Sequence, residues 1–449
     1  MHMQEVAQQA QTAALRLSGL STHAKNRALE AIATALLVHE ADILAANQRD
    51  VERGHQMVAR GALAKPLLDR LKLSAHKVKE MAQGVCSVAQ LPDPVGQILS
   101  AIELDAGLEL RQVTCPIGVI GAIFESRPDA VPQIASLCWK AGNAVIMKGG
   151  SEAQESNRVI GQCIRQAIAS VEAACIDAVQ LVETRADVHT LLQLDAYIDL
   201  FIPRGSNEFV RYIQEHTRVP VLGHAEGLCH AYVDRQADLM RAVAICYDAK
   251  VQYPAVCNAI ETVLVHRQIA AEFLPRLAAA YRQAGVEMRG CTASRAIVPD
   301  MLAATAADWD TEYLDLVIAI RVVESLDDAI AHINRHGSGH TDTIITEDAS
   351  AAARFLEQVD AATVMHNAST RFADGFRFGK GAEVGISTNK THARGPVGLE
   401  GLVIYKYRLV GQGHVVADYV GPQARAYTHR PLPMCQSQAG AAGAYGIPQ

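Results

Sequence analysis

A regular alternation of strand-like and helix-like segments between residues 118 and 366 constrains the fold more than any other feature. Short apolar runs are separated by helical stretches of about 10 to 20 residues, which is the spacing that parallel βαβ units require. A first series includes Gly118–Phe124 and Ala144–Met147, and a second series starts after Pro254 with Ala259–Val265. The sequence therefore predicts an α/β fold with two Rossmann-like domains, each built on an open sheet.

The domain boundaries follow from where this alternation begins and ends. Residues 1 to about 90 are rich in Ala and Leu at helical spacing, so we expect an N-terminal domain over 1–229 that starts with helices. A second α/β domain is expected over 230–385, and a return segment with a further strand over 386–418. Residues 419–449 are of low complexity, and we expect them to be disordered.

A β-rich run follows the second series of strands and helices. Leu402–Val410 (LVIYKYRLV) has no partner strand near it in the sequence. Together with a hairpin expected near residues 96–116, it predicts a β-rich oligomerisation segment and hence a homo-oligomer.

The composition excludes several classes of protein. Lys and Arg number 41 against 48 Asp and Glu, so no overall positive charge favours a nucleic-acid partner. No apolar run approaches the ~20 residues of a membrane-spanning helix, and no secretory signal is recognisable, so we expect neither a membrane protein nor a secreted one. The 10 cysteines contain no C-x-x-C pair, which favours reduced thiols in the cytoplasm and predicts no metal site.

One cysteine lies where catalytic groups are often found. Cys257 stands in the loop Tyr253–Asn258, directly before the strand-like run AIETVLVH. Loops at the ends of sheets carry function, and a thiol there can be activated by backbone dipoles or a nearby cation. The alternative is a buried structural thiol, and the local sequence alone favours that alternative.

Three other corners between a strand and a helix could bind an anion. Arg127 follows the strand GVIGAIF, and Lys148 with Gly149 and Gly150 follows the next strand. Glycines allow a phosphate to approach backbone N–H groups closely. Arg204 follows a further strand in the same way. Each pattern also occurs in ordinary turns, so none of them alone assigns a site.

Five stretches taken together resemble the gamma-glutamyl phosphate reductases, a branch of the aldehyde dehydrogenase superfamily. They occur in the expected order, and the resemblance extends over roughly residues 5 to 418. The stretches are PIGVIGAIFESRPDAVPQIASLCWKAGNAVIMKGGSEA (116–153), FIPRGS (201–206), VCNAIETVLVH (256–266), EYLDLVIAIRVVESLDDAIAHINRHGSGHTDTIIT (312–346) and NASTRFADGFRFGKGAEVGISTNKTHARGPVGLEGL (367–402).

The resemblance implies an enzyme that reduces L-glutamate 5-phosphate with NADPH to L-glutamate 5-semialdehyde and phosphate, the second step of proline biosynthesis from glutamate. Cys257 matches the nucleophile of the family, whose thiolate forms a thioester. Asn258 is a candidate for binding the oxyanion, and Arg127 for binding the oxyanion or the leaving phosphate. The acyl phosphate substrate also suggests functional coupling to glutamate 5-kinase.

The resemblance also assigns the residues expected to bind ligands. Lys148 matches a lysine that holds a cofactor ribose, and Glu312 matches a glutamate that holds the nicotinamide ribose. The remaining candidates are Gly149, Gly150 and Ser151 for the adenosine end of the cofactor, and Asn367, Arg371, Lys390 and Arg394 for the substrate.

Two alternatives remain open. A hydrolytic aldehyde dehydrogenase needs a general base to activate water, usually a glutamate, and the aligned position here is His224. A catalytically silent relative that binds nucleotide is the second alternative. The presence of Cys257, Lys148 and Glu312 argues against that second alternative.

Overall fold

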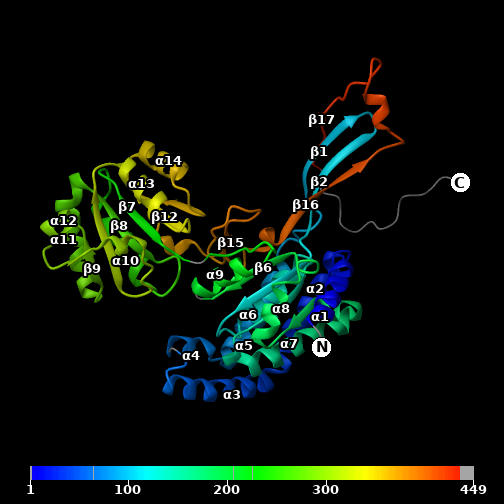
Figure 1. Cartoon of the computed structure of the whole chain (residues 1–449), viewed down its shortest axis with the longest axis horizontal. Coiled ribbons are helices and arrows are strands. Elements are labelled where there is room, and N and C mark those ends of the chain that lie inside the picture. Colours follow the sequence, from blue (N-terminus) through cyan, green and yellow to red (C-terminus); the bar gives the residue numbers. More distant parts are fainter. Residues whose placement is uncertain (1–2, 64, 206, 225, 435–449) are drawn as a thin grey trace.

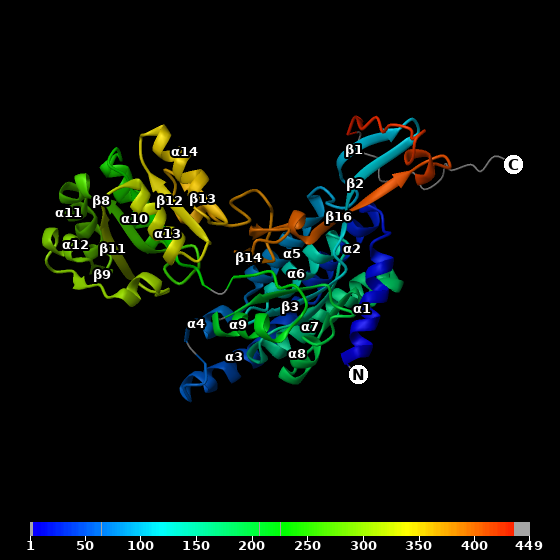
Figure 2. The ribbon, with the colours of Figure 1, turned by 45° about the horizontal axis from the view of Figure 1, so that its top comes forward.

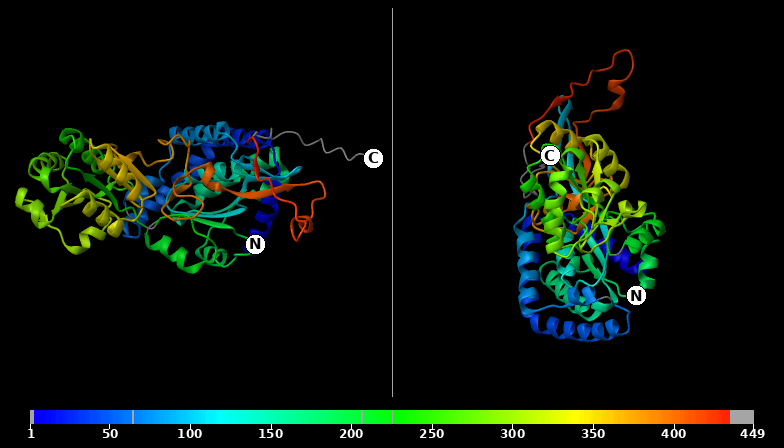
Figure 3. Two further views of the ribbon diagram at one scale, coloured as in Figure 1. Left: turned by 90° about the horizontal axis from the view of Figure 1, so that it is seen from above. Right: turned by 90° about the vertical axis from the view of Figure 1, so that its left-hand side faces the viewer.

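The computed structural model describes residues 3–434 except residues 64, 206 and 225. Two α/β domains lie side by side along the long axis of the molecule, and a four-stranded arm extends from the N-terminal domain (Figures 1 and 2). The left view in Figure 3 shows the same separation of the second domain from the arm. The predicted fold class is confirmed.

The N-terminal domain begins with helices, as expected. Ser21 and Ser74 cap two of them by accepting hydrogen bonds from the backbone N–H groups of Ala24 and Lys77. The helices are α1 (Met3–Leu17), α2 (Thr22–Val38), α3 (Glu40–Ala59), α4 (Lys65–Leu71) and α5 (Ala75–Gln90). The apolar faces of α1, α2, α3 and α5 join the same core as the first sheet, whereas Leu68 and Leu71 of α4 belong to a separate small cluster.

The first sheet is parallel, with the strand order β5-β4-β3-β6. All six residues of β3 are buried, which is why this segment reads as a continuous apolar run in the sequence. The strands are β3 (Val119–Phe124), β4 (Ala144–Lys148), β5 (Val179–Leu181) and β6 (Leu200–Arg204). The helices around them are α6 (Ala130–Lys140), α7 (Gln154–Val171), α8 (Arg185–Leu191) and α9 (Asn207–His216).

The second sheet is also parallel and has the order β10-β9-β11-β8-β7-β12-β13. Its strands are β7 (Cys229–Val233), β8 (Ile260–His266), β9 (Glu287–Gly290), β10 (Leu302–Ala303), β11 (Val317–Val323), β12 (Thr341–Ile345) and β13 (Thr363–His366). Its helices are α10 (Leu239–Val251), α11 (Arg267–Gln283), α12 (Thr292–Ile297), α13 (Leu326–His336) and α14 (Ala349–Gln358). Because β7, β8 and β12 are parallel neighbours, the loops that precede them meet at one edge of the sheet.

The chain then returns to the N-terminal domain. Val384, Val397 and Leu402 are buried in the core of that domain, so packing on it begins just before residue 386. The short strands of this segment are β14 (Gly385–Ser387) and β15 (Gly395–Val397). None of the described helices is long and apolar enough to cross a bilayer.

The arm is an antiparallel sheet with the order β16-β2-β1-β17. Its strands are β1 (Ile98–Asp105), β2 (Leu108–Pro116), β16 (Val403–Val410) and β17 (Arg430–Pro431). The expected disorder from residue 419 is wrong for the described part of the tail, because Thr428 and Leu432 form backbone hydrogen bonds with Leu104 and Ala101. Residues 435–449 lie outside the described residues.

Candidate active site

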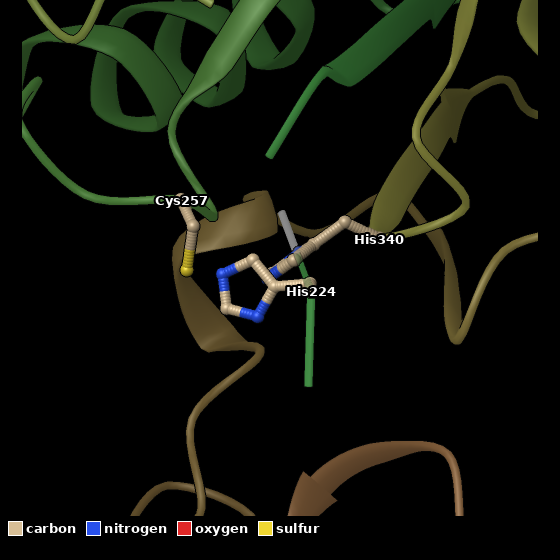
Figure 4. A group of neighbouring side chains, drawn as sticks. All are labelled: His224, Cys257 and His340. Carbon is tan, nitrogen blue, oxygen red and sulfur yellow. The ribbon is translucent and has the colours of Figure 1, made fainter. Parts of the chain in front are cut away.

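Cys257 lies in the loop that leads into β8, at the edge of the second sheet that faces the N-terminal domain, and its side chain is half-buried. The backbone of Gly227 packs against it: a Cβ atom at Gly227 would lie 2.2 Å from the Cys257 carbonyl oxygen. The Cys229 thiol donates a hydrogen bond to that same oxygen at 3.1 Å. The loop is therefore held by its backbone, and the Cys257 sulfur lies beside the His224 ring (Figure 4).

Two imidazoles lie beside this thiol. One ring nitrogen of His224, one of His340 and the Cys257 sulfur all lie within 4.8 Å of one another (Figure 4). His224 is in the position where our alignment with hydrolytic relatives expects a glutamate. Burial lowers the pKa of His224, which favours a neutral ring at neutral pH.

Asn258 and Arg371 are brought close to Cys257. The Asn258 amide donates a hydrogen bond to the carbonyl oxygen of Ala373 at 2.9 Å, and its Oδ1 is buried with no partner among the described residues. The Arg371 Nε donates to Gln252 at 2.9 Å. Burial lowers the pKa of Arg371, whereas its electrostatic interaction with Cys257 raises it, so the guanidinium lies near this side chain.

Arg127 and Arg204 line a pocket of about 360 Å³, together with Asp129 and Glu383. Arg127 donates to Asp129 at 3.1 Å. Burial lowers the pKa of Arg204 to about 10, and its Nη1 is buried without a partner among the described residues. Burial also raises the pKa of Glu383. Such a mixture of cations and carboxylates suits a small ligand that carries both charges.

A second pocket, of about 490 Å³, lies at the end of β4. Gly149, Gly150 and Ser151 line it, and a Cβ atom at Gly149 would lie 2.1 Å from the Asn157 amide nitrogen. The adjacent Glu152 accepts hydrogen bonds from the backbone and hydroxyl of Ser126, so its carboxylate is already engaged. The two glycines thus leave room for the side chains of Asn157 and Glu152, which a Cβ atom at Gly149 or Gly150 would meet.

Glu312 connects the two domains near the thiol. Its carboxylate accepts hydrogen bonds from the Gly227 backbone N–H and from the Asn207 amide, both at 3.0 Å. Since Gly227 touches Cys257, Glu312 lies close to the reacting sulfur. Lys148 is the last residue of β4, beside the glycines of the second pocket.

The other predicted substrate residues have internal partners. Lys390 and Arg394 both form ion pairs with Asp360. The Asn367 side chain accepts a hydrogen bond from Thr346 N and donates one to Thr346 O, both at 3.0 Å. These three residues therefore hold loops in place, and the contacts of the described residues do not join them to the group around Cys257.

The sequence does not indicate two residues of this region, His340 and Glu383. Arg204 is among the corners that could bind an anion, but neither its pattern nor the resemblance assigns it to the site. His340 directly precedes a buried strand and carries no local signal. Glu383 could have been suspected from its place in the glycine-rich stretch 375–385, where it accepts a hydrogen bond from Gly375 N at 2.9 Å.

Most of the chain is similar to known proteins. The model of the aldehyde dehydrogenase family matches residues 1–299 and 309–389. The gamma-glutamyl phosphate reductase of a Synechococcus species is 57% identical over 94% of this chain and 93% of its own, and that of Methanosarcina barkeri is 56% identical over 94% and 96%. The crystal structure of the Thermotoga maritima gamma-glutamyl phosphate reductase superposes with a TM-score of 0.89 at 43% identity, covering 92% of this chain and 100% of that one.

Proposed function

Since the chain belongs to the aldehyde dehydrogenase family and, within it, to the gamma-glutamyl phosphate reductases, we propose that it reduces gamma-glutamyl phosphate through a thioester on Cys257. The products are glutamate 5-semialdehyde and phosphate. This proposal rests on the position of Cys257. Gly227 packs against Cys257 and donates its backbone N–H to Glu312.

The first step is attack of the Cys257 thiolate on the carbonyl carbon of the acyl phosphate. The C–S bond forms, the C–O bond to phosphate breaks, and phosphate leaves with the bonding electrons. Arg371 and Arg204 interact electrostatically with Cys257, so their positive charges are placed to attract the anionic acyl phosphate. The thioester can accept a hydride, whereas a free carboxylate cannot.

The negative charge that develops on the substrate needs donors. We assign Asn258 and the Cys257 backbone N–H to the oxyanion and Arg127 to the leaving phosphate. The buried, unpartnered Nη1 of Arg204 supports a role for this residue in binding the same anionic substrate. A guanidinium suits these roles because it can donate two parallel hydrogen bonds to phosphate or carboxylate.

NADPH is the proposed reductant. Gly149, Gly150 and Ser151 would hold its adenosine end, and Lys148 and Glu312 its riboses. When bound, it supplies the hydride. Ser151 presents a hydroxyl where NAD-specific relatives carry a glutamate, so no charge at that position opposes a 2′-phosphate.

We further propose that β16 joins two copies of the chain. Seven of its eight residues are exposed, among them Tyr405, Tyr407 and Leu409. An exposed apolar strand at the edge of a sheet is suited to pairing with another sheet.

Replacement of the nucleophile tests the proposed reaction. Cys257→Ala should abolish reduction and leave the fold and NADP binding intact, because the sulfur is needed only for covalent chemistry. Cys115→Ser is the matched control, since Cys115 is also half-buried but lies in the arm. Retention of more than about a hundredth of the activity by Cys257→Ala would refute the proposal.

A further inference from the structure

We propose that His224, Cys257 and His340 form a binding site for a thiophilic divalent cation of the Zn²⁺ class, and that occupancy of this site blocks the enzyme. The cation is an inhibitor here and no part of the reductase reaction. Its binding is independent of the proposed function, whereas the inhibition rests on Cys257 being the nucleophile.

The three side chains come from loops that the second sheet brings together. They precede β7, β8 and β12, which are adjacent and parallel, so the loops share one edge. Their ligand atoms lie within 4.8 Å of one another. Figure 4 shows the His224 ring pointing toward the Cys257 sulfur, with His340 reaching toward the same ring. Tetrahedral ligands of zinc are about 3.3 to 3.8 Å apart, given bond lengths of about 2.0 to 2.3 Å. A small rotation of each side chain would bring the three ligand atoms to this spacing.

The hydrogen bonds of the two rings leave one nitrogen of each available. His224 Nδ1 lies 2.8 Å from the carbonyl oxygen of Ile386, which can only accept, so Nδ1 carries the proton and Nε2 has a lone pair. His340 Nδ1 lies 2.9 Å from the Thr341 hydroxyl and 3.6 Å from the Cys229 sulfur, and its Nε2 has a lone pair when Nδ1 donates to that hydroxyl. The His340 side chain is completely buried, yet its Nε2 has no hydrogen-bond partner among the described residues.

This pattern matches the chemistry of zinc ligation. Metal-bound imidazoles are generally oriented by a carbonyl or hydroxyl on the second ring nitrogen, which here are supplied by Ile386 and Thr341. One thiolate and two imidazoles leave a fourth position for water. The buried Nε2 of His340 carries a desolvation cost because it has no partner among the described residues, and a bond to a metal ion would remove that cost.

The consequence for activity is direct. The thiol loses its proton to solvent when the metal–sulfur bond forms, and the sulfur lone pair that would attack the acyl phosphate is then shared with the cation. Arg204 and Arg371 repel a cation, while Glu312 and Glu383 attract it. Since charges of both signs surround the site, binding depends on the bonds from the metal to its ligands. The site suits a metal that bonds strongly to sulfur, and not Mg²⁺ or Ca²⁺, which prefer oxygen ligands.

Cobalt(II) is the probe for binding, because it reports its ligands by absorption. We expect the metal-free, full-length protein to bind one equivalent of Co²⁺ with a sulfur-to-metal band in the near ultraviolet and the visible bands of a tetrahedral site. Zn²⁺ should displace it. Cys257→Ser should lose the sulfur band, and His340→Gln should weaken binding at least about tenfold, since even residues that only support a ligand have effects of that size.

Cys291→Ser is the matched control, because Cys291 is half-buried but lies at the start of α12. It should keep the full spectrum. Circular dichroism and thermal melting show whether each variant is folded. Absence of the sulfur band in the wild type, or its persistence in Cys257→Ser, would overturn the site.

A second measurement separates inhibition from binding. Zn²⁺ should stop the oxidation of glutamate semialdehyde by the wild type, and a chelator should restore the full rate. Binding with undiminished activity would refute the inhibition alone. A metal-free enzyme that binds Co²⁺ through Cys257 but has no reductase activity would refute the proposed function and leave the metal site standing.

Discussion

Gly227 packs directly on Cys257, so that a Cβ atom at position 227 would lie 2.2 Å from the Cys257 carbonyl oxygen and 2.6 Å from its Cα. The same glycine donates its backbone N–H to Glu312. One residue without a side chain therefore fixes the spacing between the nucleophile and the residue proposed to hold the cofactor.

Gly227→Ala should lower kcat/KM by about 100-fold, the loss that a displacement of about 1 Å produces at a reacting centre. The added methyl group meets backbone, which cannot rotate away. Steady-state kinetics check this. Gly84→Ala is the control, because Gly84 lies in α5 with open space around it, and this variant should keep full activity with unchanged or slightly higher stability. Equal activity of both variants would contradict the proposed role of the contact.

Cofactor preference should depend on the charge at Ser151. A carboxylate there would repel the 2′-phosphate of NADPH, and the only neighbouring carboxylate in the loop, Glu152, is held by Ser126. Ser151→Glu should therefore impose a penalty of about 1 to 3 kcal/mol on NADPH and shift preference toward NADH. The ratio of kcat/KM for the two cofactors measures the shift. Ser151→Gln adds similar bulk without charge, and an equal shift in that variant would argue against electrostatic discrimination.

Lys250 and Glu261 form a buried ion pair between α10 and β8 at 2.6 Å, and both side chains are almost completely buried. Glu261 also accepts a hydrogen bond from Leu314 N, near Glu312. Lys250→Met removes the cation and leaves the carboxylate in the core. We expect a loss of about 3 to 5 kcal/mol in the free energy of unfolding, measured by urea denaturation at neutral pH.

The pH dependence of this loss provides its control. Burial raises the pKa of Glu261 to about 7, above its ordinary value of 4.5. Because the pKa of Glu261 is higher in the folded state than in the unfolded state, its contribution to stability is lost as pH rises. Removal of the Lys250 cation raises the pKa of Glu261 in the folded state further. The destabilisation by Lys250→Met should thus be larger at about pH 8 than at about pH 5. It should lose this dependence in the double variant with Glu261→Gln. A constant difference in the single variant would contradict the assignment.

The sequence predicted long elements better than short ones. The apolar spacing of Ala130–Lys140 is repeated over several turns and predicts a helix, and α6 has those same bounds. The sequence does not indicate the elements between residues 284 and 316, since β9, β10 and α12 have only 4, 2 and 6 residues. Periodicity cannot be recognised over so few positions.

The candidate site also contains some residues that the sequence indicates and others that it does not. Cys257, Arg127 and the glycine pair stand in recognisable loops after or before strands, so their chemistry could be suspected from the sequence. His340 comes close to the thiol from a distant part of the chain, and only the folded sheet brings it there. Lys390 and Arg394 were assigned by resemblance, and their shared ion pairs with Asp360 could not be foreseen.

The thioester on Cys257 is tested most directly by one progress curve, recorded with glutamate 5-semialdehyde and NADP in phosphate-free buffer. We expect about one equivalent of NADPH per active site and then no further turnover, because an acyl-enzyme accumulates when no acyl acceptor is present. Addition of phosphate, or of arsenate as its mimic, should start sustained turnover. Steady production of NADPH without either anion would show that water cleaves the acyl-enzyme, and would contradict the phosphate-dependent mechanism.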